Sequence, residues 1–459
     1  MPITSLHFTN VGPFEDADFA FDEHVNVFTG PNNSGKSSVL WVLGETLTFP
    51  FAFPEKLLRK AEANFEINIR KGTEVDQLKG TVPMSGGIFS LPMVEMFSAL
   101  RRWNDVLEGI GYTSFVPALR RSTDYRSEGP SVNRHDEADS RLMRKIDPER
   151  LKSIDPKLIE GIDDELVRRN ALIETNASLV SDEAVIQKMI ELDYRAYRRD
   201  ESGPREIIKN IADIASEITA GFPISFLRID EDKSGLFPQF QTIDGDLPLN
   251  VLSQGTQSIL QWLAHLLLGY AQYYDYPSNL ADNPGILIID EIDVHLHPSW
   301  QRRIIPTLTS HFPNLQIFCS THSPLMLAGL KEGQVQLLRR DENGKVIVSR
   351  NETDITGWSA DEILRNFLDV SSPTDLGTVQ NVDRLQELRR KDTLSDEEST
   401  ELENLRQTVS QDLIGGPMSQ QVDDLSQVLK QARSSSSTSL GQPATPSPPS
   451  SSRRRKTRG

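Results

Sequence analysis

The stretch GPNNSGKSS at residues 30–38 decides the fold class of this 459-residue chain. Gly30–Ser37 satisfies the pattern G-x-x-x-x-G-K-[ST], which requires a strand before it and a helix after it. The alternating segment Val25–Thr29 supplies the strand, and the apolar run Val39–Leu43 predicts a helix that stops before Pro50. The alternative is a chance glycine-rich turn, which this strand–loop–helix context disfavours.

Such a loop has a clear chemical use. Successive backbone N–H groups and the helix N-terminus can surround a polyphosphate, and glycine permits the tight turns. We predict that Lys36 reaches the β- and γ-phosphates and that the Ser37 hydroxyl is a ligand of Mg²⁺. The predicted nucleotide-binding residues of the loop are Gly30, Pro31, Asn32, Asn33, Ser34, Gly35, Lys36, Ser37 and Ser38.

A second element is the apolar strand Ile286–Ile289, which ends in two carboxylates, Asp290 and Glu291. Parallel α/β sheets bind ligands at the carboxyl ends of their strands. Asp290 is predicted to help hold Mg²⁺, and Glu291 to orient or deprotonate an attacking water. A solvated acidic turn is the alternative, but the phosphate loop makes a nucleoside triphosphatase the favoured interpretation.

Two further segments have both a functional and a structural interpretation. Ser253 and Gly255 open the apolar helix 252–270 and could form another anion site, or Ser253 could be an ordinary helix cap. His322 follows the strand that contains Cys319, where it is either a functional imidazole or a structural histidine. Cys319, the single cysteine, is predicted to be a buried strand residue, and it rules out an internal disulfide.

Composition excludes several classes of protein. The chain has 49 Lys plus Arg against 66 Asp plus Glu, a formal net charge of -17. The acidic excess lies in residues 1–430, because residues 431–459 carry basic residues and no acid. Such a body is not typical of a general polyanion binder. No run approaches the ~18 apolar residues of a spanning helix, and the first residues lack a secretion signal, so a cytoplasmic protein is expected.

The remaining pattern predicts an α/β protein with added helices. Helices are expected around 185–196 and 207–218, short antiparallel strands within 224–249, a hairpin at 335–350 and a helical pair at 380–391 and 396–409. We predict these domains: an N-terminal lobe with the phosphate loop at 1–120, a mainly helical insertion at 121–221, a C-terminal lobe with the acidic strand end and His322 at 222–350, a helical region at 351–430 and a disordered tail at 431–459.

The order of these motifs resembles the ATP-binding-cassette (ABC) class of P-loop ATPases. Residues 30–37 correspond to Walker A, 252–257 to the signature, 286–291 to Walker B and His322 to the switch histidine. The signature departs from LSGGQ at Gln254 and Thr256 and keeps Ser253, Gly255 and Gln257. No residue could be assigned to the Q-loop.

Within that class, residues 3–14 and the run Asp290–Pro298 resemble the RecF, SMC and OLD-like ATPases. The resemblance implies a dimer with two sandwiched ATPs, in which Ser253, Gly255 and Gln257 of one subunit face the γ-phosphate held by Lys36 of the other. His322 would contact the same phosphate, and Asp293 would lie in the loop that links the two sites. The long SMC coiled coil is excluded, because no sustained heptads lie between Lys36 and Ser253.

Residues 115–121, the sequence after His322, the segment 357–364 and the helical pair also resemble the compact ATPases of bacterial anti-phage systems such as Septu and retrons. That resemblance implies a separate effector, of which an HNH nuclease is one candidate. The chain itself lacks an HNH motif after His322. Alternatives are a stand-alone DNA repair or clamp ATPase, an ATP-binding module with little turnover and, as a minor interpretation, the energising subunit of a transporter.

Three sets of basic residues each have two possible roles. His295 and His297 could bind a metal, but the resemblance places them in the turn after Walker B. Arg120 and Arg121 could face nucleic acid or solvent, and the tail Arg453–Arg458 could bind nucleic acid weakly or act as a disordered end.

Overall fold

The computed structural model divides the chain into two compact units, Met1–Ser371 and Ser372–Gly459, and each is described by itself. The described residues are 2–48, 62–71, 74–83, 112–116, 182–199, 202–232, 235–274, 277, 279–370, 375–391 and 394–414. The predicted tail 431–459 and the pair Arg120 and Arg121 therefore lie outside them, as does most of the predicted insertion before residue 182.

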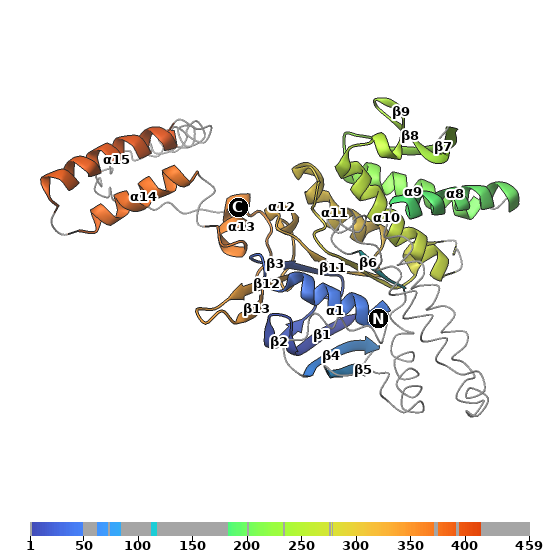
Figure 1. Ribbon diagram of the computed structural model, residues 1–459, viewed down its shortest axis with the longest axis horizontal. Helices are drawn as coiled ribbons and strands as arrows, with labels where there is room; N and C mark the ends of the chain where they lie inside the picture. The colour runs from blue at the N-terminus through green and yellow to red at the C-terminus, as the bar shows by residue number, and fades with distance from the viewer. Residues whose placement is uncertain are drawn as a thin grey trace, which may run out of the picture. The chain divides into compact units, whose positions relative to one another are not determined.

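A six-stranded sheet in the order β13-β12-β3-β11-β10-β6 forms the centre of the first unit (Figure 1). Only β13 is antiparallel; the other strands run parallel. The strands are β3 Val25–Thr29, β6 Tyr112–Val116, β10 Gly285–Ile289, β11 Leu315–Ser320, β12 Val335–Arg340 and β13 Val346–Arg350. The parallel order brings the carboxyl ends of β3, β10 and β11 to one edge of the sheet.

Alternate residues of these strands enter two different hydrophobic cores. Leu287 and Ile289 pack with the helices on one face, whereas Ile286 and Ile288 pack on the other. Because a strand points successive side chains to opposite faces, such continuous apolar runs are expected where both faces are covered. The predicted α/β class is confirmed, and Cys319 is a buried strand residue, where burial raises the pKa of its thiol.

One face is covered by α1, Lys36–Thr48, which lies between the central sheet and an antiparallel sheet of order β2-β1-β4-β5 (Figure 1). The strands of this second sheet are β1 Ile3–Val11, β2 Phe14–Ala20, β4 Glu62–Lys71 and β5 Glu74–Pro83. The rings of Phe8, Phe14 and Phe19 pack on one another at tilted and edge-on angles, in the same hydrophobic core as the apolar residues of α1. The pair β4–β5 falls in a region for which the sequence pattern gave no assignment.

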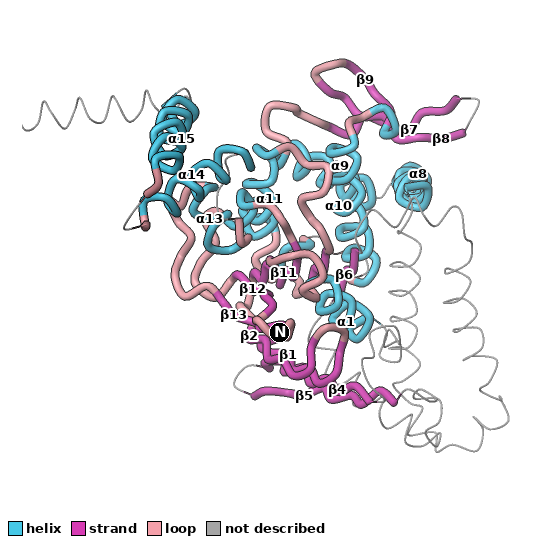
Figure 2. Tube along the Cα trace, turned by 60° about the vertical axis from the view of Figure 1, so that its left-hand side comes forward, coloured by secondary structure: helices cyan, strands magenta, loops and turns pink. Residues whose placement is uncertain are grey.

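The other face carries a layer of helices (Figure 2). Its elements are α8 Asp182–Arg199, α9 Ser202–Ile218, α10 Gln254–Tyr273, α11 Pro298–His311, α12 Pro324–Leu327 and α13 Ala360–Phe367, with short turns η3 Leu249–Val251 and η4 Leu280–Asp282. A small sheet in the order β7-β8-β9 comprises β7 Ser225–Asp232, β8 Gly235–Thr242 and β9 Gly245–Pro248. The predicted helices near 185–196 and 207–218, the strands within 224–249 and the hairpin at 335–350 are confirmed.

No helix in the described part of the chain could cross a membrane.

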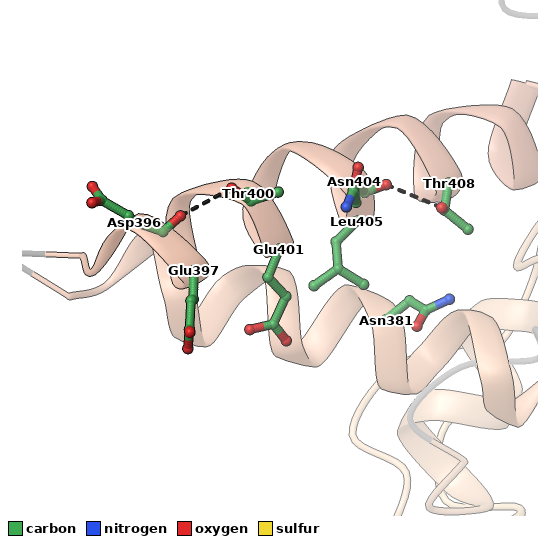
Figure 3. A pocket seen from close by; sticks show the side chains of 8 residues that line it. All are labelled: Asn381, Asp396, Glu397, Thr400, Glu401, Asn404, Leu405 and Thr408. Atoms are coloured by element: carbon green, nitrogen blue, oxygen red, sulfur yellow. Dashed lines mark hydrogen bonds between the residues drawn. The ribbon is translucent and has the colours of Figure 1, made fainter.

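In the second unit, α14 Leu376–Arg389 and α15 Asp396–Ile414 form the predicted helical pair. Arg384 binds Glu401 through two hydrogen bonds of 2.9 and 3.0 Å, and Ser395 and Glu398 make a capping box at the start of α15. A polar groove along the pair is lined by Asn381, Asp396, Glu397, Thr400, Glu401, Asn404, Leu405 and Thr408 (Figure 3). Its two threonine hydroxyls donate to carbonyls of α15 itself, so they are already used in the helix.

Candidate nucleotide site

The glycine-rich loop between β3 and α1 needs glycine at two positions. Gly30 and Gly35 have φ values of 136° and 103°, in the left-handed region that side chains rarely adopt. A Cβ at Gly30 would lie 2.1 Å from the Leu338 carbonyl oxygen, and one at Gly35 would lie 2.6 Å from Pro13 and Phe14. The loop is therefore pressed against β12 on one side and against the turn between β1 and β2 on the other.

Lys36, the first residue of α1, lies inside this loop. Its side chain is only 7% exposed, and Nζ donates hydrogen bonds of 2.9 Å to the carbonyl oxygens of Gly30 and Pro31. Burial lowers the pKa of the Lys36 amine, and the charges of Asp290 and Glu291 oppose that shift. A buried cation of this kind is prepared to receive an anion.

The two carboxylates follow β10 directly and are fixed by Ser320 at the end of β11. The Ser320 hydroxyl donates to Asp290 Oδ1 at 2.5 Å and accepts from the Glu291 amide at 2.7 Å. Glu291 has a φ of 53°, so the chain turns sharply after Asp290 and sends the two side chains in different directions. A strained backbone of this type is a frequent feature of functional sites.

His322 follows β11 and shares the electrostatic environment of these groups. Partial desolvation lowers the pKa of its imidazole, and the Lys36 charge acts in the same sense. Asp293, Glu291 and Asp290 pull this pKa in the opposite direction. The structure thus brings together Lys36, Asp290, Glu291 and His322, which are far apart in the sequence.

Several polar atoms in this region are buried and lack a hydrogen-bond partner among the described residues. They include Ser34 Oγ in the loop, Thr29 Oγ1 before it, Glu291 Oε2 and Asp293 Oδ1. Buried polar groups are normally satisfied, so these atoms are suited to contact a bound ligand. A hydroxyl and an ammonium beside the loop, facing carboxylates, fit a polyphosphate with a divalent cation. No group of three or more His, Cys, Asp or Glu side chains in the described ranges could hold a metal alone.

The signature residues behave differently, because their side chains are engaged within their own segment. Ser253 caps α10, with Oγ accepting from the Thr256 amide at 3.2 Å, and Gln257 Nε2 donates to the Leu252 carbonyl at 2.6 Å. A Cβ at Gly255 would lie 2.6 Å from the His295 carbonyl oxygen, so the start of α10 packs on the turn after β10. The structural interpretation of Ser253 as a cap is confirmed, and the nucleotide contacts of Ser253, Gly255 and Gln257 stay a prediction.

The two histidines of that turn have separate surroundings. His297 is the N-cap of α11, where Nδ1 accepts from the Ser299 amide at 3.2 Å. His295 is exposed and has a φ of 65°, which marks the second sharp bend of the turn.

Sequence reasoning missed three residues that organise the site. Ser320 fixes both carboxylates, Gln301 joins the turn after β10 to the loop after β11, and Arg340 donates to the Asn33 carbonyl at 2.7 Å. Ser320 lies within the same short run as His322, so a strand-end hydroxyl beside Walker B was the available signal. Gln301 and Arg340 lack any local signal, since their partners are brought to them by the fold.

A glycine-rich loop closed on a lysine, at the edge where an acidic strand end and a histidine meet, defines a P-loop ATPase domain. The profile of a family described as "AAA domain, putative AbiEii toxin, Type IV TA system" matches residues 83–328, and a profile described as "AAA domain" matches residues 5–80. The chain belongs to the first of these families.

The chain is also similar to a probable ATPase of a retron and to a Septu protein, as the sequence resemblance predicted. It is 28% identical to the "Retron Ec83 probable ATPase" of Escherichia coli over 45% of this chain and 36% of that protein. It is 30% identical to the "Septu protein PtuA" of Bacillus thuringiensis over 31% of this chain and 37% of that protein. The matches thus span little more than a third of these relatives.

Among solved structures, the SMC head domain from Thermotoga maritima is similar at 16% identity, with a TM-score of 0.38 over 77% of this chain and all of that one. The SmcHead bound to the C-winged helix domain of ScpA gives 14% identity and a TM-score of 0.41 over 76% of this chain and 98% of that one.

Proposed function

We propose that this chain binds ATP with Mg²⁺ and hydrolyses it. The observation that carries the proposal is the convergence of Lys36, Asp290, Glu291 and His322 at one edge of the sheet, within reach of each other's charges. Membership of an AAA-domain family and the ATPase names of relatives support the same reaction.

Each side chain has a proposed role. Residues 30–38 surround the phosphates, with Lys36 on the β- and γ-phosphates, while Ser37 and Asp290 hold Mg²⁺. When bound, Mg²⁺ neutralises charge on the phosphate oxygens. Glu291 orients or deprotonates the attacking water through Oε2, which has no hydrogen-bond partner among the residues that the structure describes. His322, whose lowered pKa favours the neutral imidazole at pH 7, donates a hydrogen bond to the γ-phosphate.

We further propose that the active assembly is a dimer or a larger even-numbered oligomer. Ser253, Gly255 and Gln257 would then complete the site of another copy. Support comes from the order of the motifs along the chain, which resembles that of ABC ATPases; Ser253 would have to share its capping hydrogen bond to reach a phosphate of another copy. The same proposal assigns the two lobes of the ATPase head to residues 1–120 and 222–350.

The Glu291→Gln variant tests the reaction and the assembly together. Loss of the general base should reduce phosphate release from ATP by roughly 10²–10⁴-fold and leave nucleotide binding intact. ATP should then accumulate at the site, and multi-angle light scattering should report a larger mass with ATP than without. Equal and negligible phosphate release in wild type and variant would instead identify a nucleotide-binding clamp with little turnover.

The partner is proposed to be a separate effector protein, such as a nuclease, in a defence system. Support comes from the retron and Septu names of relatives, of which this chain matches little more than a third. An affinity-tagged Glu291→Gln protein, purified from its native cell in ATP, should retain an effector in stoichiometric amount, detectable by mass spectrometry. Recovery of the protein alone or with DNA would favour a stand-alone repair ATPase.

A further inference from the structure

The side chain of Gln301 connects two loops that leave neighbouring strands of the central sheet. Gln301 lies in the first turns of α11, half-buried, between the turn after β10 and the loop after β11. The first loop contains Glu291 and the second contains His322. A residue placed between these two loops can set the distance between the groups that act on the same phosphate.

The amide uses both of its ends for this connection. Nε2 donates to the Leu296 carbonyl at 3.1 Å and lies 3.5 Å from the Asp293 carbonyl, while Oε1 accepts from the Ser323 hydroxyl at 2.6 Å. Ser323 is 6% exposed and is the residue directly after His322. Both ends of the amide therefore contact the two loops, with Nε2 on the turn after β10 and Oε1 on the loop after β11.

The Gln301 amide is the second place at which hydrogen bonds join the two loops; the first is at the ends of β10 and β11. There, Ser320 binds the Glu291 amide, and the Ile292 amide donates to the Ser320 carbonyl at 3.1 Å. Beyond that point, the Gln301 amide supplies hydrogen bonds to both segments, to Leu296 in one and Ser323 in the other. Packing of α11 on α12 adds an apolar connection between the same two regions.

The acidic turn also touches the start of α10. A Cβ at Gly255 would contact the His295 carbonyl at 2.6 Å and the Trp300 ring at 3.1 Å, and Trp300 precedes Gln301. The residue that packs on the signature segment, Trp300, is thus the neighbour in sequence of Gln301, whose amide binds the loop that contains His322.

We propose that Gln301 is a positioning residue that holds the His322 loop in register with Glu291. This inference rests on the proposed ATPase function and assigns to it a residue outside the Walker A, signature, Walker B and switch motifs. Gln301 does not touch the nucleotide; it acts through Ser323 and the Leu296 carbonyl. Its loss should slow the chemical step and leave ATP binding on the Lys36 loop unaffected.

Gln301→Met is the variant of choice, because methionine keeps the length and the helix propensity and removes only the hydrogen bonds. Gln334→Met is a matched control on the same groove beside α11: Gln334 accepts from the Lys331 amide at 2.9 Å and donates to Asp22 at 3.3 Å, away from the site. Steady-state phosphate release at varied ATP, nucleotide affinity and thermal unfolding are measured for both. We expect kcat of Gln301→Met to fall roughly tenfold to hundredfold, with KM and affinity unchanged within about twofold.

A double-mutant cycle with Ser323→Ala tests the proposed route. Ser323 Oγ also accepts from the Leu325 amide, so Ser323→Ala removes the cap of α12 as well. If Gln301 acts through Ser323, the double variant should therefore be no slower than Ser323→Ala alone, because the same connection is already lost. Multiplied losses in kcat, or KM rising in parallel with a fall in kcat and in unfolding temperature, would show a general structural role and overturn the proposal. Turnover of Gln301→Met equal to that of Gln334→Met would do the same while leaving the proposed ATPase intact. Wild-type phosphate release that does not depend on Lys36 rejects the proposed function itself, and this inference with it.

Discussion

The phosphate loop and the signature segment lie on the same unit but differ in what their polar groups do. Around residues 30–38, Ser34 and Glu291 have buried side-chain atoms that lack hydrogen-bond partners in the described part of the chain. Lys36 is buried too, and its burial lowers the pKa of its amine. At residues 253–257, Ser253 and Gln257 bind neighbouring atoms of the same helix start.

This difference indicates which of the two regions expects a ligand. An unsatisfied buried group is costly, about 1–3 kcal/mol, and a bound polyphosphate with its cation would supply partners to Ser34 and Glu291 beside the buried Lys36. A satisfied helix cap has no such requirement, and Ser253 would have to exchange or share its hydrogen bond to reach a phosphate. The phosphate loop should therefore be needed for binding, and the signature segment only for turnover in an assembly.

The largest expected effect comes from Lys36→Ala. The variant should lose nucleotide affinity, and its phosphate release should fall roughly 10²–10³-fold, because the buried cation that receives the phosphates is gone. Fluorescent-nucleotide titration and phosphate release measure the two effects. Lys331→Ala is the matched control, since Lys331 is exposed and pairs with Asp354 at 3.2 Å on the surface.

Equal turnover in Lys36→Ala and Lys331→Ala would remove the phosphate loop from the mechanism. The contrast between the two regions would then have no functional meaning.

A smaller effect is expected when the signature segment alone is blocked. Ser253→Arg should retain nucleotide affinity, because Lys36 is untouched, yet lose turnover if the arginine obstructs the site of another copy. Mixing Ser253→Arg with Lys36→Ala should then restore activity, since a mixed dimer contains one intact composite site. With random pairing the mixture should recover about a quarter of the wild-type rate.

No recovery on mixing, with each variant shown to exchange subunits, would mean that the segment acts within its own chain. In that case Ser253 is a helix cap only, and the effect of its replacement is a local one.

The sequence predicted the parts of this molecule in which local pattern and chemistry coincide. The strand–loop–helix around Lys36, the strand before Asp290 and the cap of α10 all follow from residues adjacent in the chain. The sequence also placed the phosphate loop, the Asp290–Glu291 pair and His322 after strands, and parallel pairing of β3, β11 and β10 brings the ends of those strands to one edge.

Long-range pairing was not predictable in the same way. The strands β4 and β5 lie in a stretch without a clear period, and their assignment depends on β1, to which β4 pairs. Gln301 looks like an ordinary polar residue of an amphipathic helix, and its two partners come from loops that only the sheet order brings together. Ser320 is an intermediate case: its place after an apolar strand was visible, whereas its contact with Asp290 required the parallel neighbour β10.

The smallest effect is expected for Ser320→Ala, which removes one buried hydroxyl from the phosphate site itself. The Ser320 hydroxyl is buried and satisfies both Asp290 and the Glu291 amide, so its loss should lower the stability of the first unit by about 1–3 kcal/mol. Ser310→Ala is the control, because that hydroxyl donates only to the Thr307 carbonyl of its own helix. Since Asp290 would also lose a fixed orientation, the Mg²⁺ concentration for half-maximal turnover should rise in Ser320→Ala and not in Ser310→Ala. A lowered unfolding temperature with an unchanged Mg²⁺ requirement would restrict Ser320 to a structural role and leave the orientation of Asp290 to the backbone of β10 alone.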